Sequence, residues 1–473
     1  MNKQFAVAIL GAGLGTRFKS KRAKLLHEAG GRKLIEHAVR TAAKLSASKI
    51  FAIVGYQADA IQKAITEADS KLAGGKVRFL LQDKPLGTGH ALKCGQKELR
   101  AAAPLLLVYC GDTPLLRPET LRDFLSYHRR LKATATVMTA IMADPSGYGR
   151  MVRSADGQVD AIVEHKSASA DILAIREINT GIYCFDTKEL FSQLDRLKPD
   201  RLTGEYYLTD VISGLRQECK RVEGYPIADA GEVMGVNTRI ELAQADALLR
   251  ARKAREMMLH GVTIMQPESV RIDPDVEIGP DTILEPGVML LGSTRVGSDC
   301  SIGAYSRITN SRIEDGVTIL QCSVVADSII KREASVGPFA HIRPGTEVGP
   351  QAKIGNFVEV KKSKIGRGTK AGHLTYLGDA IIGDNVNVGA GTITCNYDGE
   401  KKHTTIIESN AFIGSGTELV APIRIGRNAY VGAGSTITKN VPADALAVAR
   451  THQVIKPEWV KQRKRKSKAK KKA

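Results

Sequence analysis

Residues 331–355 read KREASVGPFAHIRPGTEVGPQAKIG, a stretch in which an aliphatic residue is followed by glycine at Val336, Val348 and Ile354. Most such pairs are spaced by six residues or a multiple of six. A hexapeptide repeat of this kind predicts short parallel strands stacked into a β-helix, with the aliphatic side chains pointing inward and Gly, Asp, Asn and Ser in the turns. The pairs recur at Ile278-Gly279, Val296-Gly297, Ile302-Gly303, Ile365-Gly366, Ile382-Gly383, Val388-Gly389, Ile413-Gly414, Ile425-Gly426 and Val431-Gly432.

The phase of the repeat slips between Ile354 and Ile365 and again between Val388 and Ile413. We interpret both slips as insertions that protrude as loops, which is where sites are usually built on a rigid scaffold.

The N-terminal half has a different pattern, in which apolar runs such as FAVAIL, IFAIVG and LLLVYC alternate with helical stretches. This alternation predicts a doubly wound α/β domain over residues 1–239. Residues 240–260 are rich in Ala, Leu, Arg and Glu and predict a linker helix, which Gly261 would cap. The β-helix then covers residues 261–460.

The net charge of +19 is concentrated at the C-terminus, because residues 461–473 (KQRKRKSKAKKKA) carry nine cations and no acid. We expect this tail to be disordered, with weak contact to RNA or an anionic surface as the alternative. Seven scattered cysteines without a C-x-x-C pair, and the lack of a signal peptide or an 18-residue apolar run, predict a cytoplasmic protein that binds no membrane.

Residues 10–17 read LGAGLGTR directly after an apolar run, so their backbone N–H groups can surround a phosphate while Arg17 supplies charge. Lys24 offers a second cation for the same phosphates. Asp112 follows the run LLLVYC, at the edge of the sheet where ligands bind in such domains, and a carboxylate there suits Mg²⁺. A tight turn and a turn cap are the structural alternatives for the loop and for Asp112.

The densest polar stretch of the repeat region is residues 355–399, which contain GNFVEVKKS, AGHLTYLGDA and GAGTITCNYDG. His373 is the nearby group that titrates around neutrality, so it is the candidate general base for an acyl transfer. A structural hydrogen-bonding role is its alternative, and Glu359 either orients the site or is a surface charge.

The combination of GxGTR, Lys24, QxxxLGTGHA (82–91), GDxPL (111–115), GYGR (147–150), EINTG (177–181) and GEYYLTD (204–210) resembles the sugar-nucleotide pyrophosphorylases. Over nearly the whole chain apart from the tail, the sequence is similar to the bacterial bifunctional N-acetylglucosamine-1-phosphate uridyltransferases and glucosamine-1-phosphate acetyltransferases. The resemblance implies a Rossmann-like nucleotidyltransferase domain and a left-handed parallel β-helix of hexapeptide repeats. It also implies a homotrimer that supplies precursors for peptidoglycan and lipopolysaccharide.

The resemblance assigns residues to UTP or the UDP-sugar, with Asp112 and Asn237 also on Mg²⁺: Leu10, Gly11, Ala12, Gly13, Arg17, Lys24, Gln82, Gly87, Thr88, Cys110, Gly111, Asp112, Gly149, Glu164, Asn179 and Asn237. It makes His373 the base of acetyl transfer and assigns the acceptor glucosamine-1-phosphate to Arg343, Lys361, Tyr376 and Asn387. It assigns acetyl-CoA to Ala390, Asn396, Tyr397, Ser415, Ala433 and Arg450, with Asn396 and Tyr397 lining the reacting amine.

This sequence departs from the family at Cys110, where a tyrosine is usual, and at Arg22-Ala23, where Leu-Pro is usual. Gly11, Leu14 and Arg32-Lys33 also differ from the commonest residues. These changes bear on the shape of the loop and on base contacts, and not on the phosphate and metal residues.

Three readings of the chain follow. The first is an enzyme that acetylates glucosamine-1-phosphate and then uridylylates the product. The second is a nucleotidyltransferase with one activity and a purely structural β-helix, which the cluster around His373 argues against. The third is a nucleic-acid-binding protein, for which the body lacks basic stripes interleaved with aromatic residues, since the aromatic content is 5%.

Overall fold

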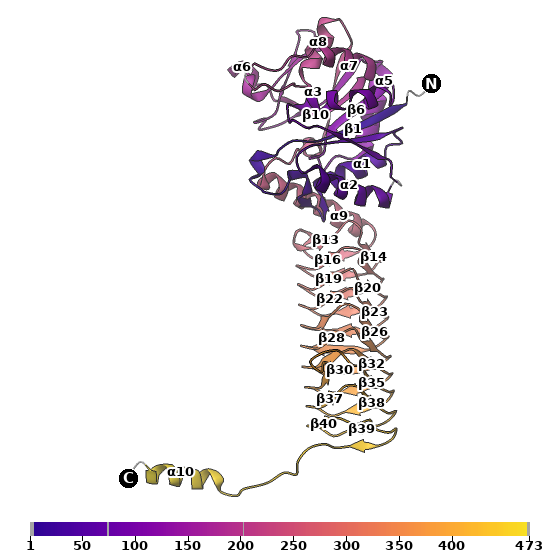
Figure 1. The fold of residues 1–473 in the computed structure, drawn as a ribbon, viewed down its shortest axis with the longest axis vertical. Helices are drawn as coiled ribbons and strands as arrows, with labels where there is room; N and C mark the ends of the chain where they lie inside the picture. The colour runs from indigo at the N-terminus through magenta and orange to yellow at the C-terminus, as the bar shows by residue number, and fades with distance from the viewer. Residues whose placement is uncertain (1–3, 73–74, 202, 471–473) are drawn as a thin grey trace. The chain divides into compact units, whose positions relative to one another are not determined.

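The computed structural model describes residues 4–72, 75–201 and 203–470, which form two compact units, Met1–Lys253 and Ala254–Ala473. Figure 1 shows an α/β unit followed by a stack of short strands. The strands of the first unit are β1 (Phe5–Gly11), β2 (Glu28–Ala29), β3 (Arg32–Lys33), β4 (Ile50–Val54), β5 (Val77–Leu81), β6 (Leu105–Cys110), β7 (Ala135–Ile141), β8 (Arg150–Arg153), β9 (Val159–Val163), β10 (Glu177–Asp186) and β11 (Val222–Pro226).

Helices lie on both faces of the main sheet of the first unit, which contains all of these strands except β2 and β3. They are α1 (Leu34–Ala43), α2 (Ala58–Leu72), α3 (Thr88–Cys94), α4 (Gln96–Arg100), α5 (Pro118–Leu131), α6 (Ala170–Leu173), α7 (Thr187–Arg196) and α8 (Asp210–Gln217), with 3₁₀ turns η1 (Thr16–Phe18), η2 (Lys24–Leu26), η3 (His165–Ser167) and η4 (Ala230–Val233).

The alternation of side chains along β1 separates the two cores. Val7 and Ile9 pack with α1, α2 and α5, whereas Ala6 and Ala8 pack with α3, α4, α7 and α8. Because successive strand residues point to opposite faces, one apolar run serves both layers. The prediction of a doubly wound α/β domain is therefore confirmed.

The main sheet has the order β11-β7-β10-β6-β1-β4-β5. Strands β1, β4, β5 and β6 are parallel, while β10 runs antiparallel to both β6 and β7. The register between β10 and β7 shifts between Asn179 and Tyr183. This irregularity lies at the start of β10, at the edge where β1 and β6 end.

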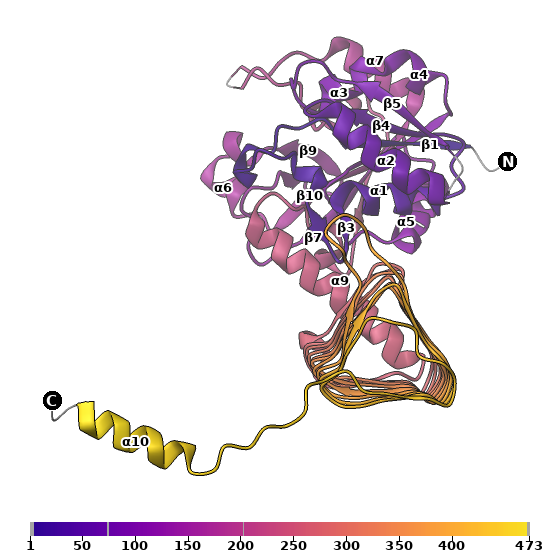
Figure 2. The same ribbon diagram turned by 60° about the horizontal axis from the view of Figure 1, so that its bottom comes forward.

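Three parallel sheets make up the second unit, and in the view of Figure 2 their stacked coils have a triangular section. The first sheet contains β12 (Thr263–Ile264), β15 (Ile283–Leu284), β18 (Ser301–Ile302), β21 (Thr318–Ile319), β24 (Ser335–Val336), β27 (Lys353–Asn356), β30 (Lys370–His373), β33 (Asn387–Val388), β36 (Phe412–Ile413), β39 (Tyr430–Val431) and β41 (Leu446–Ala447).

The second sheet contains β13 (Arg271–Ile272), β16 (Met289–Leu291), β19 (Arg307–Thr309), β22 (Val324–Ala326), β25 (His341–Ile342), β28 (Glu359–Lys361), β31 (Tyr376–Gly378), β34 (Ile393–Cys395), β37 (Glu418–Val420) and β40 (Thr436–Ile437). The third contains β14 (Glu277–Ile278), β17 (Arg295–Val296), β20 (Arg312–Ile313), β23 (Ile329–Ile330), β26 (Glu347–Val348), β29 (Lys364–Ile365), β32 (Ala380–Ile382), β35 (Thr405–Ile407) and β38 (Ile423–Ile425); a 3₁₀ turn, η5 (Pro267–Ser269), precedes β13.

The aliphatic residues of the repeat fill the interior of the coils as predicted, and Val336, Val348 and Ile354 are completely buried. Of the two phase slips, the second is the expected insertion, because Asn387 pairs with Phe412, 25 residues on, whereas Lys370 pairs with Asn387, 17 residues on. The prediction of an insertion between Ile354 and Ile365 is wrong. There Lys353 pairs with Lys370, so the coil is only a regular short one.

Helix α9 (Arg239–Leu259) is the predicted linker helix, displaced by one residue from the predicted 240–260. Its first turns pack on the core of the first unit through Ala245 and Leu249, and its last turns pack on the β-helix core through Ala254 and Met257. Gly261 has the positive φ of 90° expected of a capping glycine.

The prediction of a disordered tail over residues 461–473 differs from the structure, which has helix α10 (Trp459–Lys470). Lys, Arg and Ala are good helix formers, so composition alone did not exclude a helix. The side chains described in it are exposed, and residues 471–473 lie outside the described residues.

Candidate active sites

A cavity of about 600 Å³ opens at the carboxyl ends of β1 and β6. The loop after β1, the turn η2 and the N-terminus of α3 surround it, so polar groups distant in sequence converge there. The lining includes most of the predicted nucleotide residues: Leu10, Gly11, Ala12, Gly13, Arg17, Lys24, Gln82, Gly87, Thr88, Cys110, Asp112 and Glu164. Leu14, Gly15, Thr16, Leu25, Pro85, Ala91, Glu205 and Tyr207 complete it.

Two glycines allow the backbone to come close in this cavity. Gly15 has φ 63°, and a Cβ on it would lie 2.9 Å from the Cβ of Lys24. Gly87 has φ 98°, and a Cβ on it would lie 2.7 Å from the carbonyl oxygen of Tyr206. Both contacts are too short for any side chain, so these loops require glycine.

The ammonium of Lys24 joins the two predicted metal ligands. Lys24 Nζ donates to Asp112 Oδ2 at 2.5 Å and to Asn237 Oδ1 at 3.0 Å. The side chains of Lys24 and Asp112 are only 13% and 17% exposed. Two hard oxygen atoms from different segments therefore converge on one cationic position.

Cys110 lines the cavity at the point where the resemblance leads one to expect tyrosine. Burial, together with Asp112, raises the pKa of its thiol to about 12, so the thiol is neutral at pH 7. The departure thus places a small, uncharged side chain beside the Lys24–Asp112 pair.

Glu164 contributes a carboxyl group that accepts a hydrogen bond from Thr209 Oγ1 at 3.1 Å. Burial raises its pKa, and the neighbouring carboxylates of Asp210 and Glu205 raise it further. Four other predicted residues lie beside the cavity and do not line it: Gly111, Gly149, Asn179 and Asn237. Asn179 is buried, donates to Tyr183 Oη at 2.7 Å and bonds to Gly149 through the backbone.

The second candidate site is the group of residues around His373 on the β-helix, which the strand register brings together. Asn356 pairs with His373 across β27 and β30, and Glu359 pairs with Tyr376 across β28 and β31. The repeat thus brings residues 17 positions apart side by side.

His373 has a defined partner that sequence reasoning missed. Its Nδ1 lies 2.5 Å from Asn356 Oδ1, and since the amide oxygen only accepts, Nδ1 carries the proton. The other ring nitrogen, Nε2, is then unprotonated in the neutral ring and can accept a proton. His373 itself is exposed, so an acceptor substrate can reach it.

Cations gather beside this histidine. Arg343 Nη1 forms an ion pair with Glu359 Oε1 at 2.6 Å, a contact through which Glu359 could orient Arg343. Lys402, which the sequence analysis did not select, lies against Lys361. That contact is the main reason why the pKa of Lys361 is lowered, with a further contribution from Arg343. Three cations, Arg343, Lys361 and Lys402, lie beside fewer carboxylates, and such a cluster is suited to a phosphate.

Four of the six residues assigned to acetyl-CoA, Ala390, Ser415, Ala433 and Arg450, follow one another along successive coils. The N–H of Gly416 donates to Ala390 O, and the N–H of Gly434 donates to Ser415 O at 2.8 Å. Arg450 Nη1 donates to Ala433 O at 2.8 Å and is the last of the four. Asn396 donates to Asp379 Oδ2 at 2.6 Å and approaches Tyr376 Oη at 3.5 Å, while Tyr397 is exposed beside it.

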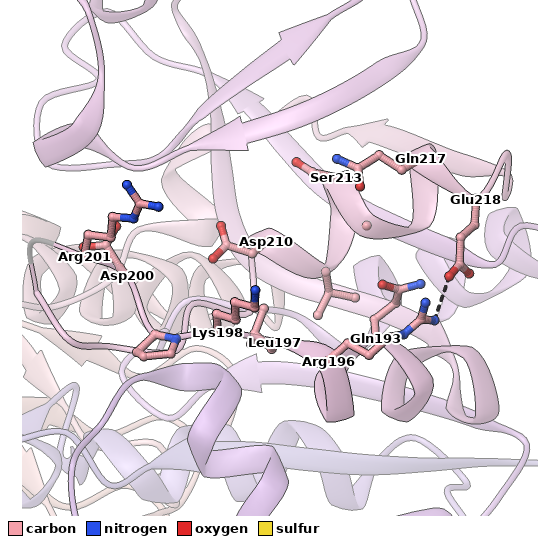
Figure 3. Close-up of a pocket in the computed structure, with 13 residues that line it drawn as sticks. Gln193, Arg196, Leu197, Lys198, Asp200, Arg201, Asp210, Ser213, Gln217 and Glu218 are labelled. Atoms are coloured by element: carbon pink, nitrogen blue, oxygen red, sulfur yellow. Dashed lines mark ion pairs between the residues drawn. The ribbon is translucent and has the colours of Figure 1, made fainter.

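Another cavity, of about 690 Å³, lies between α7 and α8 and contains none of the predicted residues (Figure 3). Arg196 and Glu218 form an ion pair of 2.6 Å at its wall. Among the described residues, no helix is long and apolar enough to cross a membrane, and no group of three or more His, Cys, Asp or Glu side chains could hold a metal.

Family models match most of the chain. The nucleotidyl transferase model matches residues 6–227, the GMPPB C-terminal domain model matches residues 261–346, and the model of bacterial transferase hexapeptide repeats matches residues 404–439. These matches agree with the Rossmann-like domain and the left-handed parallel β-helix.

Curated relatives match over their whole length. The "Bifunctional protein GlmU" of Shouchella clausii is 47% identical over 461 residues, which is 98% of this chain and 99% of that protein. The protein of the same name from Koribacter versatilis is 48% identical, covering 99% of each chain, and that from Brevibacillus brevis is 47% identical with the same coverage.

Proposed function

Because the chain belongs to the family of bifunctional GlmU proteins, which have uridyltransferase and glucosamine-1-phosphate acetyltransferase activities, we propose how the two clusters divide this work. The cavity at β1 and β6 performs uridylyl transfer. The cluster around His373 performs the acetyl transfer that precedes it. The observation that carries the proposal is that an oriented histidine and a cation cluster occur together on the β-helix. A purely structural β-helix requires neither of them.

In uridylyl transfer the UTP phosphates lie against the backbone N–H groups of the loop after β1, with Arg17 and Lys24 neutralising their charge. A phosphate oxygen of N-acetylglucosamine-1-phosphate attacks the α-phosphorus of UTP as the bond to the β-phosphate oxygen breaks, and pyrophosphate leaves. This exchange needs no protein nucleophile. The residues of the cavity position the reactants and stabilise the charge that develops.

The same cavity fits Mg²⁺. Asp112 and Asn237 offer two oxygen atoms at 2.5 and 3.0 Å from the Lys24 ammonium. The ammonium thus occupies a position that is suited to a metal cation. Mg²⁺ is commonly held by one or two protein oxygens together with water and substrate phosphates, so a larger acidic cluster is not required. When bound, the ion would neutralise part of the phosphate charge.

In acetyl transfer Nε2 of His373 removes a proton from the amine of glucosamine-1-phosphate. The amine nitrogen then attacks the thioester carbonyl of acetyl-CoA. The C–S bond breaks, and CoA leaves as a thiol after protonation. Asn356 keeps the proton on Nδ1, which fixes the ring in the tautomer that can act as base. Arg343 and Lys361 bind the phosphate of the acceptor.

We also propose that the protein is a cytoplasmic homotrimer. An apolar ridge runs beside His373 along one corner of the β-helix, where the side chains of Tyr305, Phe339, Phe357 and Leu374 are between 48% and 71% exposed. The rings of Phe339 and Phe357 stack with centroids 5.4 Å apart. Apolar surface of this extent indicates a contact with another protein surface. Seven unpaired cysteines support a reducing compartment.

The test is a coupled assay with glucosamine-1-phosphate, acetyl-CoA, UTP and Mg²⁺ in which CoA thiol and UDP-sugar are followed separately. We expect both products, with UDP-sugar formation depending on acetyl-CoA. His373→Ala should release no CoA while still converting supplied N-acetylglucosamine-1-phosphate. If the wild-type protein makes UDP-sugar only from pre-acetylated substrate and releases no CoA, the β-helix is structural and the protein has one activity.

A further inference from the structure

The insertion in the β-helix carries a small hairpin next to the acceptor site. The extra residues lie between β34 and β35, where Tyr397 and Lys402 form an antiparallel bridge. The N–H of His403 donates to Asn396 O at 2.8 Å, and the N–H of Asp398 donates to Lys401 O at 3.2 Å. The hairpin therefore begins at the acceptor-lining Asn396 and returns Lys402 to the same place.

Asp398 is the centre of this hairpin. Its Oδ1 accepts the backbone N–H groups of Glu400 and Lys401, both at 2.8 Å, and its Oδ2 lies 2.6 Å from Nε2 of His403. These hydrogen bonds, with those of the Lys401 backbone and the His403 side chain largest, hold the pKa of Asp398 well below its usual range. One carboxylate thus links the turn of the hairpin to its returning strand.

Lys402 is the cation that this hairpin delivers. It lies against Lys361, and Arg343 is close enough to lower the pKa of Lys361 as well. Like charges repel, so Lys402 stays beside Lys361 only where other contacts of the hairpin hold it there.

We propose that Asp398 and His403 form a clamp that positions Lys402 beside Lys361 and so completes the binding site for the phosphate of the acetyl acceptor. Both are positioning residues, because their contacts are to the hairpin and not to the reacting atoms. This inference rests on the proposed function of the His373 cluster. What it adds is a role for the Asp398–His403 pair, which holds the hairpin that carries Lys402.

Loss of the clamp should act on binding more than on the chemical step. A phosphate contact is made equally in the ground state and the transition state, so removing it raises KM and leaves kcat nearly unchanged. His403→Ala should raise KM for glucosamine-1-phosphate about tenfold, the loss expected for one partly exposed charge-assisted contact. His403→Gln keeps a donor for Asp398 and should restore most of the affinity.

The experiment measures acetyl transfer with wild-type protein, His403→Ala, His403→Gln and Lys361→Ala, each as the full-length chain. The matched control is His260→Ala, because His260 is an exposed histidine of the same unit whose Nδ1 lies 2.7 Å from the Glu256 carbonyl oxygen, in the linker helix and not in the hairpin. Uridylyl transfer from supplied N-acetylglucosamine-1-phosphate reports the folding of the first unit, and thermal unfolding of each sample reports that of the β-helix. Inorganic phosphate serves as a competitive probe, and its inhibition constant should rise with KM in His403→Ala.

The outcomes separate the clamp from the function on which it rests. If Lys361→Ala raises KM and His403→Ala does not, the clamp is wrong while the phosphate site stands. If Lys361→Ala leaves KM unchanged, the proposed acceptor site is wrong. A fall in kcat at constant KM in His403→Ala, or a failure of His403→Gln to recover KM, also overturns the clamp.

Discussion

Asp112→Ala is the change that most directly tests the uridylyl-transfer site. In the structure the Asp112 carboxylate lies 2.5 Å from the Lys24 ammonium, which has Asn237 Oδ1 as its other partner. Removing the carboxylate leaves a cation that is 13% exposed with one neutral acceptor, and it removes one of the two oxygens suited to Mg²⁺. Both substrate positioning and charge neutralisation should suffer.

The expected size of the loss follows from the kind of contact. Loss of one preorganised electrostatic contact at the site of charge development costs about 2.7–4 kcal/mol, which is about 10²–10³ in kcat. The effect on folding should be smaller, because a hydrogen bond between charged groups contributes about 1.5–3 kcal/mol and Asn237 still pairs with Lys24. Asp112→Asn keeps the shape of the side chain and removes its charge, so its kcat should lie between that of the wild-type protein and that of Asp112→Ala.

The assay follows pyrophosphate release from UTP and N-acetylglucosamine-1-phosphate across a series of Mg²⁺ concentrations, and CoA release from the same samples. We expect Asp112→Ala to need more Mg²⁺ and to turn over at least 100-fold more slowly, with acetyl transfer within about twofold of wild type. A chelator should abolish uridylyl transfer in wild type and spare acetyl transfer. Uridylyl transfer with unchanged Mg²⁺ dependence would refute the assignment of Asp112, and loss of both activities in a folded protein would refute the independence of the sites.

The remaining predictions concern three other contacts. Asn356→Ala frees Nδ1 of His373, and should lower kcat of acetyl transfer about tenfold to a hundredfold with little change in KM, as measured by initial rates; an unchanged kcat would show that the ring needs no support. Gly87→Ala forces a Cβ to 2.7 Å from the Tyr206 carbonyl oxygen at a φ of 98°. It should lower the free energy of unfolding, measured with denaturant, by about 1–3 kcal/mol, and it should also weaken UTP binding. Glu164→Gln should raise the melting temperature at pH 8 and not at pH 4. Burial raises the pKa of Glu164, so between the unfolded and the native pKa the native state binds more protons than the unfolded state. The stability of the wild-type protein therefore falls as pH rises from the unfolded pKa through the higher native pKa. Equal shifts in melting temperature at both pH values would contradict that sign.

Sequence patterns predicted the fold where a single periodicity controls it. The spacing of aliphatic-glycine pairs gave the coils, and the change in composition located the linker helix within one residue of α9. The orientation of β10 could not be predicted, because an apolar run has the same appearance in a parallel and an antiparallel strand. The slip at Ile354 was misread since counting in sixes does not distinguish an added residue from a missing one, whereas the pairing of Lys353 with Lys370 does.

The candidate site residues that the sequence predicted and the structure brings together are those that follow strands or form a motif, such as Lys24, Asp112 and His373. Asn356 was missed because an asparagine in a repeat resembles an ordinary turn residue. A signal existed: the regular coil of 17 residues, counted back from His373, ends on Asn356. Lys402 had no such signal, because it lies in an insertion without periodicity and reaches Lys361 only through the folding of the hairpin.

The two sites prepare for phosphate in opposite ways, and the difference has a consequence for each. At Lys24 the cation already has an anion, Asp112. Under the proposed Mg²⁺ assignment, a metal ion at the same two oxygens would compete with the ammonium for them and would leave it to the triphosphate. Metal and nucleotide should therefore bind in a mutually dependent manner. At Lys361 the cation faces another cation, Lys402, while Asp379 lies nearby and Glu359 pairs with the neighbouring Arg343. Under the proposed acceptor assignment, the phosphate would relieve the repulsion between the lysines, and the backbone and hydrogen bonds around them would hold the cluster together before it binds.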